Sequence, residues 1–91
     1  MSDDRFEWDD RKAARNLRDH KVSFGLARAA FDDLLAIAEL VDDPDEVRWN
    51  RIASARGRIL FIVHTPRGNR IRIISARKAE RHEQDRYWAE R

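Results

Sequence analysis

The sequence predicts an α+β fold, with a small antiparallel sheet, two helices before most of its strands and one helix after them. Three observations lead to this class. Two capped segments with helical periodicity lie before residue 33, strand-like segments joined by short glycine-containing connectors follow, and a charged helical segment ends the chain. The length of 91 residues indicates a single domain that spans residues 1–91.

The first part of the chain is expected to contain one short strand and two helices. "RFEW" at residues 5–8 is the strand candidate. Asp9 can cap a helix over residues 10–20, because its carboxylate can accept the unpaired backbone N–H groups of a first turn. Ser23 can cap a second helix over residues 24–32 in the same way. In each helix, apolar side chains recur at helical spacing.

The second part is expected to hold most of the sheet. Strands are predicted at residues 34–40, 47–55, 58–65 and 70–74. Short connectors at residues 56–57 and 66–69 join the last three strands, which therefore form an antiparallel meander. Ser75 is predicted to cap a final helix over residues 76–90. The resulting element order is β-α-α-β-β-β-β-α.

The even-numbered hairpin loops predict which side chains share a face of the sheet. Ala55 is paired with Arg58, and Thr65 with Arg70. The mostly apolar face, expected to meet the first two helices, comprises Val47, Trp49, Ala53, Leu60, Ile62, His64, Ile71 and Ile73. The other face includes Arg48, Asn50, Ile52, Phe61, Val63, Arg70, Arg72 and Ile74. Arginines this close repel one another, so the second face favours an anion. An odd loop or a bulge would change the assignment.

Charge is distributed unevenly along the chain. Residues 1–45 hold 12 acidic and 7 basic side chains, whereas residues 46–91 hold 5 acidic and 12 basic ones, of which 11 are arginines. Arginine carries a planar set of donors that suits phosphate. The second half therefore predicts a surface for nucleic acid or an acidic protein, and the alternative interpretation is a solvated basic surface.

The composition also excludes several classes of protein. The chain has no cysteine, which fits a reducing compartment and excludes thiolate-bound metals. Three scattered histidines do not predict a metal site, and no cofactor motif is present. No apolar run approaches the length of a membrane span, and the acidic N-terminus does not resemble a signal peptide. These features predict a cytoplasmic protein without membrane contact.

The C-terminal segment presents polar groups where a helix that packs on a sheet would carry apolar ones. At helical spacing, Ala76, Ala79, Glu83 and Tyr87 fall within one arc, so Glu83 and Tyr87 are expected to point toward the sheet. These two residues, with Arg72 and Arg77, are the candidate site. The alternative is structural: Glu83 pairs with a sheet arginine and Tyr87 packs half-buried.

Several motifs resemble the BrnT toxins of bacterial type II toxin–antitoxin modules, over nearly the whole chain. The resemblance rests on "FEWD" (6–9), Lys12, Ala13, Asn16, His20 followed by "VSF" (22–24), "FDD" (31–33), "RIISARKA" (72–79), Glu83 and Tyr87. Asp19, Gly25, Leu26 and Leu34 depart from the usual family pattern. These departures lie away from the C-terminal motif and affect the details of partner binding.

The resemblance implies a RelE-like fold and a ribonuclease that cleaves RNA without metal and arrests translation. It also implies a ribbon-helix-helix antitoxin (BrnA-like) that neutralises the toxin and carries it to operator DNA. In that frame, Arg72 and Arg77 would stabilise the transition state and Glu83 would be the candidate base. Tyr87 would transfer a proton or stack on a base. The RNA-binding candidates are Arg48, Asn50, Arg70, Lys78 and Arg81.

Some relatives on this fold inhibit DNA gyrase and cleave no RNA, so fold alone does not establish function. The alternative is therefore a non-catalytic homologue that binds a protein target such as gyrase, or that acts only as an antitoxin-bound co-repressor.

Overall fold

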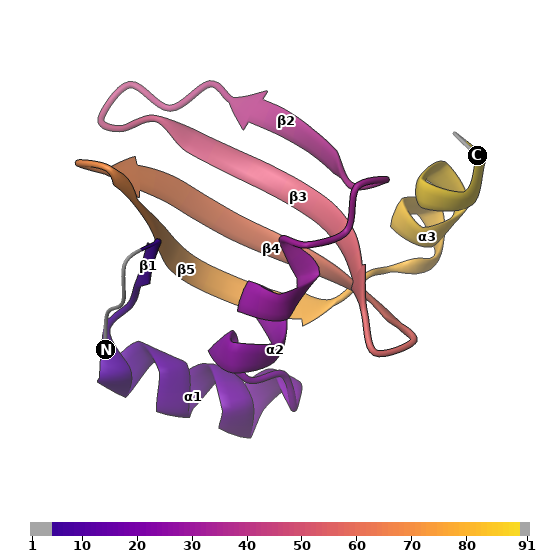
Figure 1. Ribbon diagram of the computed structural model, residues 1–91, viewed down its shortest axis with the longest axis horizontal. Coiled ribbons are helices and arrows are strands. Elements are labelled where there is room, and N and C mark those ends of the chain that lie inside the picture. The colour runs from indigo at the N-terminus through magenta and orange to yellow at the C-terminus, as the bar shows by residue number, and fades with distance from the viewer. Residues whose placement is uncertain (1–4, 90–91) are drawn as a thin grey trace.

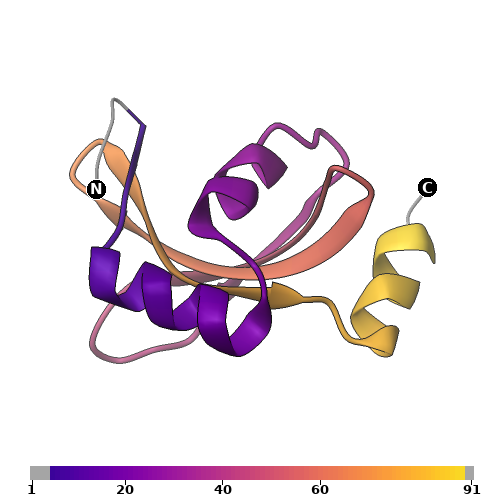
Figure 2. The ribbon, with the colours of Figure 1, turned by 90° about the horizontal axis from the view of Figure 1, so that it is seen from below.

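The computed structural model describes residues 5–89, which form a five-stranded sheet; the first helix runs beside one edge of the sheet, the second lies over one face, and the third stands at one end (Figures 1 and 2). The elements are β1 (Phe6–Glu7), α1 (Asp10–His20), α2 (Phe24–Ala30), β2 (Ile37–Val41), β3 (Arg48–Ala55), β4 (Arg58–Arg67), β5 (Arg70–Lys78) and α3 (Arg81–Ala89). The strand order is β1-β5-β4-β3-β2, with only β1 and β5 parallel. The predicted α+β class is confirmed.

The two N-terminal helices begin where their caps predict. The Asp9 carboxylate accepts a hydrogen bond from the backbone N–H of Lys12 at 3.0 Å, and the Ser23 hydroxyl accepts one from Leu26 at 3.0 Å. The second helix ends at Ala30 and not at residue 32, because the chain tightens there into a turn. Asp33 N–H donates to the carbonyl of Ala30 at 3.1 Å, a contact between residues three apart.

The two hairpins differ in how well their registers were predicted. Ala55 pairs with Arg58 as expected, across a turn in which Arg56 and Gly57 both have positive φ. Thr65 pairs with Arg72 and not with Arg70, because β4 runs on to Arg67 and the turn is shorter than predicted. This difference of two residues leaves residues 70–73 on their predicted faces, since side chains alternate with a period of two. Ile74, which was expected on the face with Arg72, has no partner on β4.

The last strand is longer than predicted, and the expected helix over residues 76–90 with Ser75 as its cap is wrong. β5 continues to Lys78, and α3 begins only at Arg81. Tertiary contacts hold the segment extended. Ala76 pairs with Ile62 on β4, and on its other side its backbone exchanges hydrogen bonds with the Asn16 side chain at 2.7 and 3.1 Å. These contacts give the backbone N–H and C=O of Ala76 their hydrogen-bond partners in the extended conformation. In a helix the same groups would need partners within the helix.

An irregularity in β5 decides which face the end of the strand presents. His64 pairs with Ile73 and Val63 pairs with Ser75, so Ile74 is an extra residue without a partner on β4. The bulge puts Ala76 on the face toward the helices and Arg77 on the opposite face. Arg72 and Arg77 are five positions apart and would face opposite ways in a regular strand, but the bulge places both on the same face.

The core lies between the sheet and the first two helices. Its fully buried members include Phe24 and Ala27 of α2 and, from the sheet, Leu60, Ile62 and Ile73. The predicted apolar face is therefore confirmed for its central residues. Val47 is an exception, because it precedes β3 and is 51% exposed.

Helix α3 is set apart from this core. In both views it stands at the opposite end of the molecule from α1, beside the end of β5 (Figures 1 and 2). Its buried side chains are Glu83 and Tyr87, one polar and one aromatic. No helix within residues 5–89 is long and apolar enough to cross a membrane.

Candidate functional site

The sheet face that turns away from α2 is the open face. It carries Asn50 and Ile52 from β3, Phe61 and Val63 from β4, and Arg72, Ser75 and Arg77 from β5. Their registered partners share the face, because residues directly opposite one another in an antiparallel pair lie on the same side. Helix α3 covers only one end of it, so most of the open face has no helix packed on it.

Arg77 and Glu83 form a two-point ion pair at the end of the open face beside α3. The guanidinium nitrogens of Arg77 donate to the two carboxylate oxygens of Glu83, each at 2.9 Å. The guanidinium also lies 4.3 Å from the ring centre of Phe61, the cross-strand partner of Arg77. An arginine held on two sides is a preorganised cation, which is what stabilisation of a charged transition state requires.

Glu83 has a second role at the start of α3. Its Oε1 accepts the backbone N–H of Glu80 at 2.8 Å, so it pairs a donor that the first helical turn leaves without an intrahelical partner. Burial by itself would raise the pKa of Glu83, but the hydrogen bonds from Arg77 and Glu80 and the charges of Arg77 and His82 outweigh it and lower that pKa. The hydrogen bonds to Glu83 outweigh burial and, with the charges of Glu83 and Glu80, raise the pKa of Arg77. Glu83 is therefore an ionised carboxylate with low basicity.

Arg72 lies toward the opposite end of β5. It donates to Glu7 at 2.7 Å, next to the parallel pairing of β1 with β5. Because β5 continues past Ser75 to Lys78, Arg72 and Arg77 do not meet; five positions of strand separate them by about 16 Å. The two arginines share a face but occupy different parts of it.

Tyr87 is buried and holds α3 against the rest of the fold. Its hydroxyl donates to Asp33 Oδ2 at 2.6 Å, and the same oxygen accepts the backbone N–H of Ser54 at 2.8 Å. Only 4% of Tyr87 is exposed. This geometry matches the structural alternative for Tyr87 more closely than stacking on an RNA base, which needs an accessible ring.

The RNA-binding candidates are spread over the rim of the open face. Arg48 is paired with Asp43 at 3.5 Å and Glu46 at 3.2 Å, and Arg81 with Asp85 at 3.5 Å. Arg70 and Lys78, at the two ends of β5, form no ion pair with any other described residue. Asn50 lines a pocket next to α3.

His64 lies on the apolar face of the sheet, as the sequence analysis predicts. His64 is 5% exposed on the core face and accepts a hydrogen bond from Arg51 at 3.3 Å. Burial, followed by the charge of Arg51, lowers the pKa of His64 to about 4, so it is neutral near pH 7. His20 ends α1 and His82 is exposed on α3.

Three residues that the sequence analysis did not assign to the site prove to organise it. Glu7 holds Arg72, Asp33 holds Tyr87, and Asn16 holds the segment of β5 that leads to Arg77. All belong to the motifs that carry the BrnT resemblance, but their partners lie 54 to 65 positions away. No local pattern reveals contacts over such a separation.

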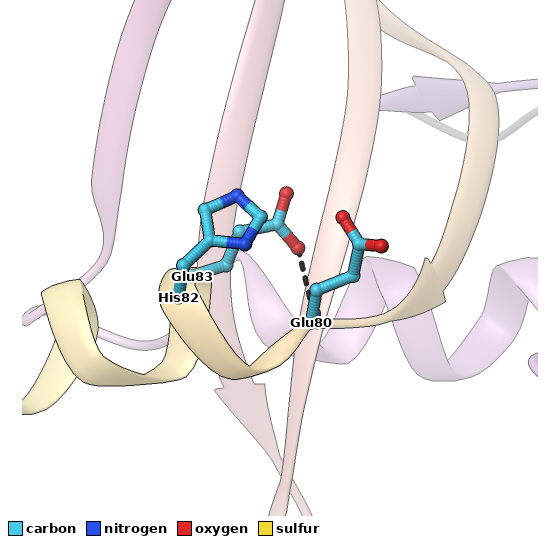
Figure 3. Close-up of side chains that lie close together, drawn as sticks. All are labelled: Glu80, His82 and Glu83. Atoms are coloured by element: carbon cyan, nitrogen blue, oxygen red, sulfur yellow. Dashed lines mark hydrogen bonds between the residues drawn. The ribbon is translucent and has the colours of Figure 1, made fainter.

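Glu80, His82 and Glu83 bring three potential metal ligands within 4.8 Å of one another (Figure 3). Figure 3 shows the Glu83 carboxylate bonded to the Glu80 backbone, while the Glu80 side chain extends separately. Both Glu83 oxygens also accept hydrogen bonds from Arg77, so a cation bound there would meet a guanidinium. The donor set therefore fits an ion pair with arginine better than a divalent metal.

Comparison with known protein families gives one assignment. A model described as "Ribonuclease toxin, BrnT, of type II toxin-antitoxin system" matches residues 8–83. The matched segment includes β5 and the Arg77–Glu83 pair, and it ends before Tyr87. No curated protein sequence is similar enough to the chain to count as a match.

Proposed function

The chain belongs to the BrnT family of ribonuclease toxins of type II toxin–antitoxin systems, and from that premise we propose that it cleaves RNA on the open face of its sheet. The cleavage is metal-independent, takes place in the cytoplasm and arrests translation. The observation that carries this proposal is the Arg77–Glu83 pair, which holds a fixed guanidinium beside α3, next to the part of the open face that no described helix covers. A cognate antitoxin neutralises the activity.

Cleavage without metal uses the ribose 2′-OH as the nucleophile against the neighbouring phosphorus. Negative charge builds up on the phosphorane oxygens in the transition state, and a preorganised cation stabilises it. We assign this role to Arg77. Arg72 lies nearer the start of β5 and binds the phosphate backbone of the same RNA strand. Arg70 and Lys78, at the two ends of β5, contribute to the same binding.

Glu83 was the candidate base, but its contacts favour another role. Its two oxygens accept three hydrogen bonds, and its pKa is lowered, so it attracts a proton from a 2′-OH only weakly. We therefore assign Glu83 as a positioning residue that fixes Arg77. Tyr87 acts through Asp33 in holding α3, and hence Glu83, against the sheet.

RNA cleavage is tested by inducing the protein in cells and mapping new RNA 5′ ends, followed by assays of purified protein on the same RNAs with and without a chelator. We expect new ends that also form in the presence of the chelator. Arg77→Ala should remove them, whereas Arg18→Ala, on the exposed side of α1, should not. Growth arrest with intact RNA would instead support the alternative, a toxin that blocks a protein target such as gyrase.

The antitoxin is proposed to cover part of the basic surface and to carry a ribbon-helix-helix domain of the BrnA type. Trp88 on α3 is 60% exposed and offers an aromatic anchor for such a partner. Operator DNA should be bound only through the antitoxin. A mobility-shift assay on operator DNA tests this: the complex should shift the DNA, and the toxin alone should not at the same salt concentration.

A further inference from the structure

A pocket of about 230 Å³ lies on the open face where α3 meets β2, β3 and β4. One cross-strand row forms its apolar part. Ile37 pairs with Ile52, and Ile52 pairs with Phe61, so these side chains lie next to one another on the same face. The pocket is thus lined on one side by two branched aliphatic side chains and an aromatic ring.

Polar groups surround this apolar lining, and one of them is unengaged. Glu39 and Arg86 are bound to each other, and His82 is exposed on α3. The side-chain amide of Asn50 lines the pocket and makes no hydrogen bond to any other described residue. A half-buried amide beside an apolar surface offers one donor group and one acceptor to a ligand.

The pocket adjoins the arginine that we assign to the reacting phosphate. Arg77 is the cross-strand partner of Phe61, and its ion-pair partner Glu83 lines the pocket. A ligand in the pocket therefore meets a small apolar surface, of which Ile52 is only 3% exposed, together with an amide and a guanidinium. A nucleotide carries the matching groups: a planar base with polar atoms on its edge, joined through ribose to a phosphate.

We propose that this pocket receives one nucleobase of the RNA substrate and that Asn50 reads the edge of that base. The inference rests on the proposed function, because it places the base beside the phosphate that Arg77 contacts. Asn50 is then a specificity-determining residue. Bidentate hydrogen bonds from a side-chain amide to a base edge are an established means of discrimination between bases.

Asn50→Asp gives the sharpest test of this role, because it keeps the shape of the side chain and removes the donor. A carboxylate has only acceptors, so it can no longer donate to a ring nitrogen of adenine. The Watson–Crick edge of guanine carries two neighbouring donors that match a carboxylate. The added charge, next to the cross-strand Glu39, weakens binding of every RNA, so the informative quantity is the ratio of affinities for two bases.

The probes are four trinucleotides, each of a single base and blocked at every 2′-OH by methylation, titrated into isotope-labelled protein and followed by NMR. In the parent we expect shifts of the Asn50 side-chain amide and of Ile52 and Phe61, with at least one base bound about fivefold more tightly than another. In Asn50→Asp the guanine-to-adenine affinity ratio should rise about fivefold or more. Asn69→Ala, an exposed amide in the β4–β5 turn, is the matched control and should leave the ratios unchanged.

RNA cleavage by the same preparations separates this inference from the proposed function. If the parent cleaves RNA but all four trinucleotides leave the pocket signals unmoved, the pocket is not the base site and the inference fails alone. If the guanine-to-adenine affinity ratio were the same in Asn50→Asp and in the parent, with both proteins folded, Asn50 would not be the residue that reads the base. If Asn50→Asp does not fold, the titration of the parent decides. If the trinucleotides shift the NMR signals of the pocket residues but the protein cleaves no RNA, the proposed function fails and base binding in the pocket stands.

Discussion

The Arg77–Glu83 pair assigns different tasks to its two members, and their substitution should show it. Arg77→Ala removes the cation and should lower the cleavage rate about 10²–10³-fold, as the loss of other preorganised donors does. Glu83→Gln keeps the shape and part of the hydrogen bonding to Arg77, so we expect a fall of less than about tenfold. The measurement is the single-turnover cleavage rate across a range of pH.

The pH profile distinguishes positioning from base catalysis at Glu83. A positioning residue changes the size of the rate but leaves the profile unchanged, whereas loss of a general base removes the acidic limb. Thermal melting of each variant is the control, because a protein that unfolds loses cleavage for a trivial reason. Abolished cleavage in folded Glu83→Gln, together with a lost acidic limb, would return the role of base to Glu83.

His64 should make stability depend on pH in a window where few other groups titrate. Its pKa is lowered from 6.5 to about 4 in the fold, first by burial and then by Arg51. Between these values the unfolded chain binds more protons, so the free energy of unfolding must fall as pH drops through the window. We expect a loss of about 1.5 kcal/mol between about pH 6.5 and 5.

Urea unfolding at a series of pH values measures this loss. The window stops near pH 5 because Glu83, whose pKa is lowered, and other carboxylates add their own losses at more acidic pH. His64→Leu should flatten the curve between about pH 6.5 and 5, and His82→Leu, at an exposed position of α3, should not. A parent protein with constant stability over this range would contradict the depressed pKa.

At the scale of single elements, the Asn16 side chain determines the conformation of β5. Its amide donates to the carbonyls of Val22 and Ala76 at 2.9 and 2.7 Å, and its oxygen accepts the N–H of Ala76 at 3.1 Å. Asn16→Ala leaves these buried backbone groups unpaired and should cost about 2–4 kcal/mol of stability. Arg15→Ala, one position earlier and exposed, should stay within about 0.5 kcal/mol of the parent in the same urea titration.

Asn16 also connects stability with the site. The bulge at Ile74 turns Arg77 to the open face, and the pairing of Ala76 with Asn16 fixes the register after that bulge. Folded Asn16→Ala should therefore also lose cleavage activity, although residue 16 belongs to α1 and bonds β5 only at its edge. If Asn16→Ala and Arg15→Ala were equally stable, Asn16 would not be what holds the end of β5 in place.

The elements that could be predicted from the sequence are those set by neighbouring residues. Asp9 and Ser23 cap helices through contacts three positions away, and the turn at Arg56 and Gly57 has the short length that an antiparallel hairpin needs. The end of β5 could not be predicted this way. Its residues have no strong strand pattern, and partners on β4 and α1 hold it extended.

The candidate site shows the same division between local and distant causes. The sequence analysis offered an ion pair between Glu83 and a sheet arginine as an alternative, but it placed Arg77 in the final helix and so did not identify the partner. The separation of Arg72 from Arg77 was not, since it depends on the length of β5. The burial of Tyr87 by Asp33 likewise depends on a contact between residues 54 positions apart.

At the scale of the whole molecule, the two halves of the chain carry opposite net charge, and the fold places the arginines of β5 on the open face. Binding of single-stranded RNA there should release counterions. Its affinity should therefore fall with salt, with a log–log slope of about −0.7 for each phosphate neutralised. The cleavage-deficient Arg77→Ala protein is a suitable background for equilibrium measurements.

Arg70 gives the clearest test of this electrostatic contribution, because it lies at one end of β5 and forms no ion pair with another described residue. In that background, Arg70→Ala should make the slope less steep by about 0.7 between about 50 and 200 mM salt. Arg18→Ala removes the same charge from an exposed position of α1, where it is paired with Asp19 at 3.2 Å. This variant should keep the original slope, because screening limits the influence of a distant exposed charge. If Arg70→Ala and Arg18→Ala made the salt dependence less steep by the same amount, affinity would depend on net charge alone. The open face would then not be the RNA-binding surface.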